Sequence, residues 1–178
     1  MKTKSWLLGL FLSTLFLIAS PAFAQVSETT LRGRACGPGR VQFDATADAS
    51  QHPLAQPEAG KAAIYFIGSF VGESPSEPTV KVGVDGAWVG AIRGRSYIFV
   101  SVPPGYHHIC VNWQSGILTP PGLFALASFT AEAGKTYYFR ARTLNVNKYY
   151  SLDVDAANDD EGQYLVASFA FSKSEPKK

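Results

Sequence analysis

The chain has 178 residues, of which 46% are apolar, 13% aromatic and 17% charged. This length suits a single domain, and the apolar fraction is too high for an intrinsically disordered protein. The formal net charge is only +2, whereas proteins that bind nucleic acid through phosphate contacts usually carry a large basic excess. The composition therefore argues against nucleic acid or a charged membrane surface as a partner.

The first 24 residues have the pattern of a secretory signal peptide. Lys2 and Lys4 precede an apolar run over 6–19, and Ala22-Phe23-Ala24 has the small–x–small pattern that signal peptidase recognises. The apolar run is shorter than the roughly 20 residues that a membrane-spanning helix needs. We therefore expect cleavage after Ala24 rather than retention as an uncleaved anchor.

The expected mature chain begins at Gln25. A lipoprotein would carry a cysteine at this position, and no lipobox is present. The rest of the chain has no run of 18 apolar residues, so no transmembrane segment is expected. Removal of Lys2 and Lys4 leaves basic and acidic residues in balance, which gives no basis for steering a charged partner. We expect a periplasmic or secreted protein.

The two cysteines fit export. Cys36 and Cys110 are the only cysteines, and an even pair in an oxidising compartment is usually a disulfide. Neither is the first residue of a CxxC or CxxH pair. We predict a Cys36–Cys110 disulfide, worth roughly 4 kcal/mol by chain entropy. Two free thiols and a metal site are the alternatives.

Beyond residue 60 the predicted elements are short strands. Residues 25–60 are rich in Gly, Pro and polar residues and are predicted to be irregular, with one strand near 40–44. The sequence Asp85-Gly86 predicts the turn of a hairpin over 79–92. Strands are predicted at 62–67, 79–84, 88–92, 96–102, 106–113, 123–130, 136–144 and 149–154.

The C-terminal part has an ambiguous element. Residues 163–171 follow an acidic stretch and fit a helix through Leu165 and Phe169, but the same apolar residues also fit a strand with period two. Residues 172–178 are polar and are predicted to be disordered. We therefore expect a mostly β fold in which 61–171 form a single antiparallel β-sandwich, Ig-like or transthyretin-like, of roughly seven to nine strands. The fold has either no helix or one short C-terminal helix in this prediction.

Four short motifs follow one another in the middle of the chain. They are PEAGKAAIYF over 57–66, VGVDGAWVG over 82–90, VPPGYHH over 102–108 and AGKTYYFR over 133–140. Over 57–144 the chain resembles the bacterial envelope family known as domain of unknown function 2846, with a core similar to PEGA-type surface modules. The resemblance implies an exported sandwich domain without an assigned catalytic residue. Members are often lipoproteins, so Gln25 in place of a lipobox cysteine is a departure.

Residues with metal or catalytic chemistry are sparse. His107 and His108 are adjacent in a predicted strand, so they point to opposite faces and do not readily share one metal ion. The acidic residues from Asp153 to Glu161 do not have the order of an EF-hand. No GxSxG nucleophile motif and no phosphate-binding loop occur. We expect no catalytic residue, no metal site and no cofactor.

Aromatic and arginine side chains supply the candidate binding surface. Residues 97–100 are apolar on both faces of their predicted strand, so either another segment covers one face or the surface meets a partner. Trp88, next to the hairpin turn, is the best exposed candidate. Tyr138, Arg140 and Arg142 share a strand face, which is either a polar binding strip or a solvated face.

These patterns predict a function class. We expect an exported, non-enzymatic binding or scaffolding module of the bacterial cell envelope, with an envelope protein or glycan as partner. One alternative is a hydrolase of an envelope polymer, which would need a cleft with a perturbed carboxylate or a His–carboxylate pair. The other is a carrier of a small apolar ligand, which would need a large internal cavity.

Overall fold

The structure is a computed structural model that describes residues 26–39, 41–70, 77–115, 122–146 and 149–178. This part of the chain holds ten strands in two sheets and two helices, so the prediction of a mostly β fold is confirmed. The helices are α1 (Glu28–Ala35) and α2 (Asp159–Ser168).

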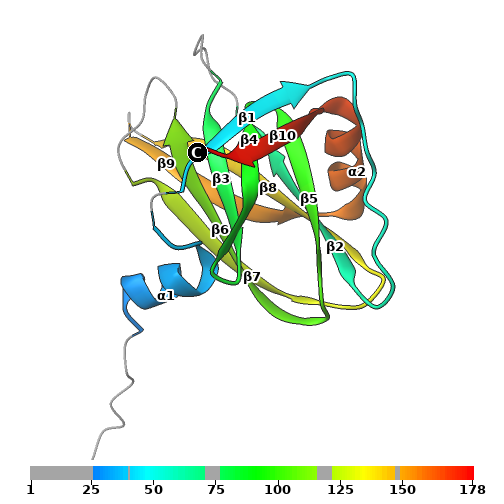
Figure 1. The fold of residues 1–178 in the computed structure, drawn as a ribbon, viewed down its shortest axis with the longest axis horizontal. Coiled ribbons are helices and arrows are strands. Elements are labelled where there is room, and N and C mark those ends of the chain that lie inside the picture. The colour runs from blue at the N-terminus through cyan, green and yellow to red at the C-terminus, as the bar shows by residue number, and fades with distance from the viewer. Residues whose placement is uncertain (1–25, 40, 71–76, 116–121, 147–148) are drawn as a thin grey trace, which may run out of the picture.

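The larger sheet has the strand order β1-β10-β5-β2-β8-β9 (Figure 1). Its strands are β1 (Phe43–Asp48), β2 (Ala62–Gly68), β5 (Ser96–Val102), β8 (Thr136–Val146), β9 (Tyr149–Ala157) and β10 (Ala170–Pro176). The pairs β2–β8 and β10–β5 are parallel, whereas its other neighbours are antiparallel. The prediction of a wholly antiparallel fold is therefore wrong for this sheet. Local turn signals predict hairpins, but no single turn joins β2 to β8 and sets their relative direction.

The smaller sheet is antiparallel throughout, with the order β4-β3-β6-β7. Its strands are β3 (Thr79–Val84), β4 (Ala87–Arg93), β6 (Gly105–Ser115) and β7 (Phe124–Ala131). The predicted hairpin over 79–92 is present as β3 and β4. Its turn places Asp85 and Gly86 at φ values of 49° and 80°, which explains the Asp-Gly sequence.

The largest buried cluster takes side chains from both sheets. Ile64 and Phe66 of β2 meet Val82 of β3 and Ile109 and Val111 of β6 in this cluster. These residues alternate along their strands, as expected when one face of each sheet is turned to a shared core. However, every residue of β2 and β3 is buried, so the opposite faces are covered as well.

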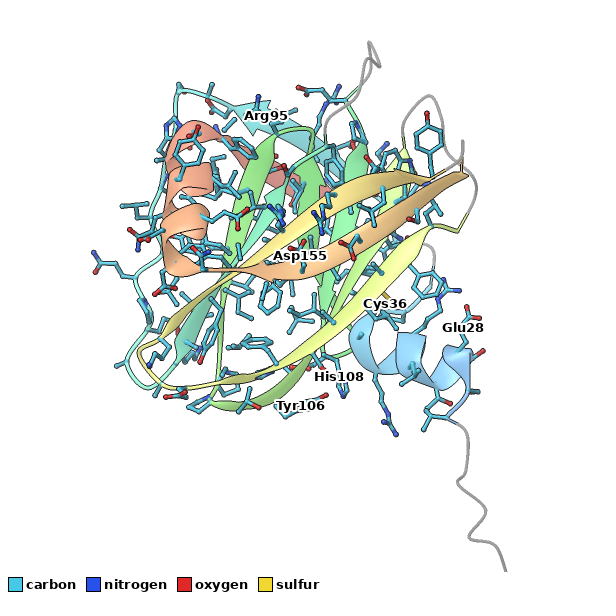
Figure 2. The ribbon with its side chains drawn as sticks, turned by 180° about the vertical axis from the view of Figure 1, so that it is seen from behind. Glu28, Cys36, Arg95, Tyr106, His108 and Asp155 are labelled. Carbon is cyan, nitrogen blue, oxygen red and sulfur yellow. A yellow bond between two sulfur atoms is a disulfide. The ribbon has the colours of Figure 1, made fainter. Side chains whose placement is uncertain are left out.

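Helix α2 covers the second face of the larger sheet (Figures 1 and 2). Leu165 and Val166 of α2 pack with Tyr65 and Tyr138 of the sheet in a separate buried cluster. The Tyr65 and Tyr138 rings stack with their centroids 5.2 Å apart. A Cβ atom at Gly162 would overlap the Tyr138 ring, so a glycine lets the helix approach this closely. This cover explains why β2 and β5 are apolar on both faces, whereas residues Ala35 and Cys36 lie against Gly83 of β3 in the smaller sheet.

The ambiguous C-terminal segment forms a helix and then a strand. Helix α2 ends at Ser168 and β10 begins at Ala170, so both readings of 163–171 are partly correct. The polar composition of residues 172–178 predicted disorder, and this is wrong for residues 172–176. They form part of β10 and pair with β1. Polar residues suit this position, since Lys173 forms an ion pair of 2.7 Å with Asp48.

The N-terminal segment is more regular than predicted. Its described part contains α1 and then β1, which begins at Phe43 and so lies slightly beyond the predicted strand over 40–44. The predicted signal peptide and its cleavage site between Ala24 and Gln25 lie outside the described residues. Among the described helices, none has the length and apolar character needed to cross a bilayer.

Candidate functional site

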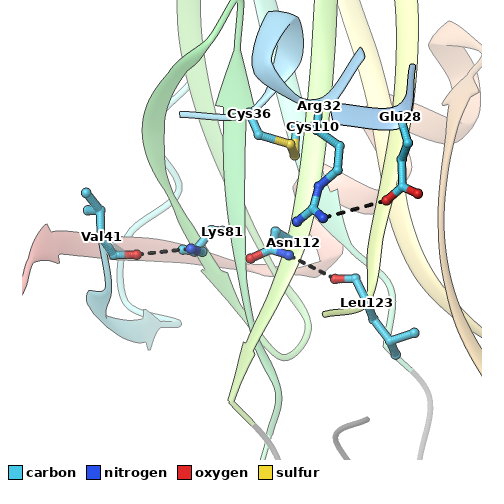
Figure 3. The surroundings of a disulfide bond; sticks show 8 residues. All are labelled: Glu28, Arg32, Cys36, Val41, Lys81, Cys110, Asn112 and Leu123. Carbon is cyan, nitrogen blue, oxygen red and sulfur yellow. Dashed lines mark hydrogen bonds and ion pairs between the residues drawn. A yellow bond between two sulfur atoms is a disulfide. The ribbon is translucent and has the colours of Figure 1, made fainter. Parts of the chain in front are cut away.

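The predicted disulfide is present. Cys36 follows the last residue of α1 and bonds to Cys110 of β6 across 74 residues of sequence, with a Cα–Cα distance of 5.0 Å (Figure 3). Ala35 is the buried residue of α1, so the helix has little apolar contact of its own. The guanidinium of Arg32 lies 4.2 Å from the ring centre of Phe124. The disulfide is therefore the main attachment of α1 to the smaller sheet.

Trp88 is half-buried, so the prediction that it is exposed is wrong. Gly37, next to the disulfide, lies so close that a Cβ atom there would overlap the indole ring. The Lys81 Nζ atom lies over the indole ring, 4.2 Å from its centre, and donates to the Val41 carbonyl at 3.0 Å. Burial lowers the pKa of Lys81. The segment around Gly37 and Val41 therefore covers the surface that Trp88 was expected to display.

His107 links the hairpin turn to a second turn. Its Nδ1 atom lies 2.6 Å from Asp85 Oδ2, and its Nε2 atom lies 2.8 Å from the Pro103 carbonyl oxygen. The other carboxylate oxygen of Asp85 accepts from the His108 backbone N–H at 2.8 Å. Both ring nitrogens of His107 therefore face oxygen atoms of the two turns.

This arrangement is a His–carboxylate pair of the kind that a hydrolase would need. However, His107 is only 5% exposed, and its second nitrogen faces the Pro103 carbonyl instead of a nucleophile. A general base in a triad needs that nitrogen to accept a proton from the nucleophile. As arranged, Asp85 and His107 hold two turns together and present no free nitrogen to a substrate.

The two adjacent histidines point to opposite faces, as predicted. His107 packs beside Phe129, whereas the His108 ring lies 5.1 Å from that of Tyr106, which is 62% exposed (Figure 2). The Tyr106 hydroxyl donates to Ser128 Oγ at 2.6 Å. No group of three or more His, Cys, Asp or Glu side chains that could hold a metal occurs in the described part of the chain.

Arg140 and Arg142 lie together on β8, but each faces carboxylates. Arg140 donates to Asp155 at 2.7 Å and also pairs with Glu161 of α2, while Arg142 donates to Asp153 at 3.0 Å. The hydrogen bond to Asp155 is the main cause of a raised Arg140 pKa. This network joins β8, β9 and α2 and engages Asp153, Asp155 and Glu161 of the acidic stretch.

Tyr138, the third member of the predicted strip, is not at the surface. Its side chain is 9% exposed and lies beneath Gly162 of α2. Burial is the main cause of its raised pKa. The structure therefore brings the two arginines together but separates them from the tyrosine by covering the latter.

A groove that sequence reasoning missed opens between β5, β10 and β4. Its volume is about 380 Å³, and it is lined by Val89, Ile98, Phe99, Phe171, Ser172, Lys173, Ser174 and Glu175. Five of these eight residues belong to β10, and four of them, 172–175, belong to the segment that was expected to be disordered. No composition signal for the groove therefore existed.

The chain was compared with known proteins. No protein family matches it, and no curated protein is similar to it at a significant level. The resemblance to the envelope family stays a prediction from the four motifs.

Proposed function

We propose that this chain is an exported, non-enzymatic binding or scaffolding module of the bacterial cell envelope. The Cys36–Cys110 disulfide is the observation that carries the location, because structural disulfides persist in oxidising compartments and are rare in the cytosol. The signal-like pattern of residues 1–24 supports the same location. Periplasm and cell exterior are both oxidising, and either one fits.

The proposed architecture is an Ig-like or transthyretin-like sandwich with covered outer faces. The shared buried cluster between the two sheets supports it. The four motifs support membership in the envelope family that the sequence resembles. Such sandwiches commonly display loops and edges to partners, but the fold class alone does not decide function.

The binding role rests on how the reactive side chains are used. His107 faces acceptors on both ring nitrogens, and Arg140 and Arg142 face carboxylates. These groups are engaged in holding elements together, which favours a structural use over a catalytic one. An envelope protein or glycan is the partner class that the location implies.

Cross-linking in intact cells tests the proposal. Cells are treated with an amine-reactive cross-linker and a thiol-alkylating reagent, and the chain is then isolated from separated envelope and cytoplasmic fractions. We expect unalkylated cysteines, recovery with the envelope, and one discrete cross-linked species. Free thiols in a cytoplasmic fraction, or hydrolysis of envelope polymer by the purified chain, would contradict the proposal.

A further inference from the structure

The edge of β5 that faces the groove is free along most of its length. β10 pairs with β5 only at Ser96↔Ala170 and Tyr97↔Phe171. Beyond Phe171, β10 pairs with β1 alone, up to Pro176. Figure 1 shows β10 turning away from β5 after this short contact. Among the described residues, no strand pairs with the outer edge of β5 from Phe99 to Val102.

The direction of the backbone groups on this edge follows from one hydrogen bond. The Ala170 N–H donates to the Arg95 carbonyl at 3.3 Å, so the Arg95 carbonyl points toward β10. Backbone groups of a strand alternate in direction every residue. Phe99 and Ser101 therefore direct their N–H and C=O groups toward the open edge of β5, which begins beside the groove at Phe99.

Between Ile98 and Val102 this edge lacks charge and proline, which protect many free strands, and the next proline of the chain lies beyond it at Pro103. Proteins block free edges with charged residues, proline or bulges, because an open edge can pair with another chain. Phe99, Val100 and Ser101 are only partly buried.

The groove joins this edge to apolar side chains. Ile98 and Phe99 of β5, Val89 of β4 and Phe171 of β10 line it. Backbone hydrogen bonds along a strand edge, combined with apolar pockets for alternate side chains, are the features that recognise an extended peptide.

The charge at the rim favours a basic ligand. Lys173 is neutralised by Asp48 at 2.7 Å. Glu175 also lines the groove and is exposed, and it has no ion pair among the described residues. The unbalanced charge of the groove is therefore negative and would orient a peptide that carries Lys or Arg.

We propose that this groove binds an extended segment of a partner protein, which adds as a strand to the free edge of β5. The segment has alternating apolar residues and one Lys or Arg near Glu175. This inference rests on the proposed function as a binding module and names the chemistry of its partner.

A displayed library of random ten-residue peptides supplies the probe. It is selected against the full chain, expressed with its own residues 1–24 and isolated unreduced from the envelope. The affinity of each selected peptide is then measured for the wild type, Ser101→Pro and Ser101→Ala. Both variants lose the hydroxyl, and only Ser101→Pro loses the N–H on the open edge. Pro is tolerated on strand edges, and matching melting temperatures of the two variants check that both fold.

The expected peptides alternate apolar residues and include Lys or Arg. Ser101→Pro weakens their binding by about tenfold relative to Ser101→Ala. Methylation of alternate peptide nitrogens has a similar effect, and this second test does not depend on a protein variant. Glu175→Lys weakens binding several-fold and removes the basic preference.

Several results would overturn the inference. They are the absence of selected peptides, equal binding by the two Ser101 variants, and self-association of the free chain that Ser101→Pro alone abolishes. The last result would assign the edge to a second copy. If peptides fail but cross-linking still finds an envelope partner, only this inference is lost and the proposed function stands.

Discussion

At the residue scale, His107 is the histidine whose ring is buried and contacts an oxygen atom through each of its two nitrogens. Replacing it with alanine removes its contacts with Asp85 Oδ2 and with the Pro103 carbonyl oxygen, whereas the His108 N–H still donates to Asp85. We expect His107→Ala to lower the free energy of unfolding by about 2–3 kcal/mol in urea denaturation, because two hydrogen bonds and the packing of a buried ring are lost.

The neighbouring His108 is the matched control for this change. Its ring lies on the opposite face beside the exposed Tyr106, so His108→Ala is expected to cost less than about 1 kcal/mol. Equal losses for the two variants would contradict the assignment of His107 to a turn-holding role.

Tyr97 is expected to make the fold sensitive to alkali. Its side chain is fully buried. Burial is the main cause that raises its pKa to about 12, and the nearby Tyr65 is a smaller cause. The unfolded chain loses this proton near pH 10, whereas the folded chain retains it to higher pH. The contribution of the protonated Tyr97 hydroxyl to the free energy of unfolding is therefore fully present below pH 10 and is lost as the pH rises toward about 12.

Tyr97→Phe tests this dependence. The variant loses the hydrogen bond to the Pro53 carbonyl, so it is expected to be about 1 kcal/mol less stable at neutral pH. Its stability should then fall less steeply than that of the wild type between about pH 10 and 12. Parallel pH profiles from urea denaturation would show that Tyr97 does not cause the alkaline loss.

At the element scale, α2 depends on a glycine. Alanine is usually a better helix residue than glycine by about 1 kcal/mol, but a Cβ atom at Gly162 would overlap Tyr138. We expect Gly162→Ala to destabilise the protein by about 1–3 kcal/mol in thermal melts, because the helix must move off the sheet.

Gly33 in α1 provides the matched control for this substitution. No atom lies within 4 Å of a Cβ placed there, so Gly33→Ala is expected to be neutral or slightly stabilising. If Gly162→Ala melts at or above the wild-type temperature, the close contact between α2 and Tyr138 is not required.

Elements joined by short turns were predictable from the sequence, and elements joined at long range were not. The Asp85-Gly86 turn gives the β3–β4 hairpin because its backbone conformation needs these residue types. The parallel β2–β8 pair has no such local signal. β10 is polar, so its composition resembles that of a tail. Its position comes from backbone pairing with β1, a strand more than a hundred residues upstream.

The features of the candidate site also divide into those that the sequence predicts and those that depend on contacts between distant residues. Chemistry in an oxidising compartment predicts the Cys36–Cys110 bond, and strand alternation predicts the opposite directions of His107 and His108. The burial of Trp88 was not predictable, because the covering residue Gly37 lies about fifty positions away in sequence. The groove was also missed, because five of its eight lining residues belong to β10.

At the scale of the whole molecule, the disulfide closes the N-terminal segment onto the smaller sheet. Loss of the bond in Cys110→Ser frees a loop of 74 residues in the unfolded chain. We expect a loss of roughly 4 kcal/mol and a fall in melting temperature on the order of 10 °C. Cys36→Ser and reduced wild type should give the same shift, and an unchanged melt would contradict a stabilising role.

The central claim is that this chain is an exported module that carries a partner. Native mass spectrometry of the unreduced protein from its own envelope tests it most directly, because one spectrum reports the N-terminus, the disulfide and bound molecules. We predict a mass for Gln25–Lys178 less two hydrogens, with a protein or glycan attached. A bare chain with free thiols, or one carrying stoichiometric metal, would contradict the account.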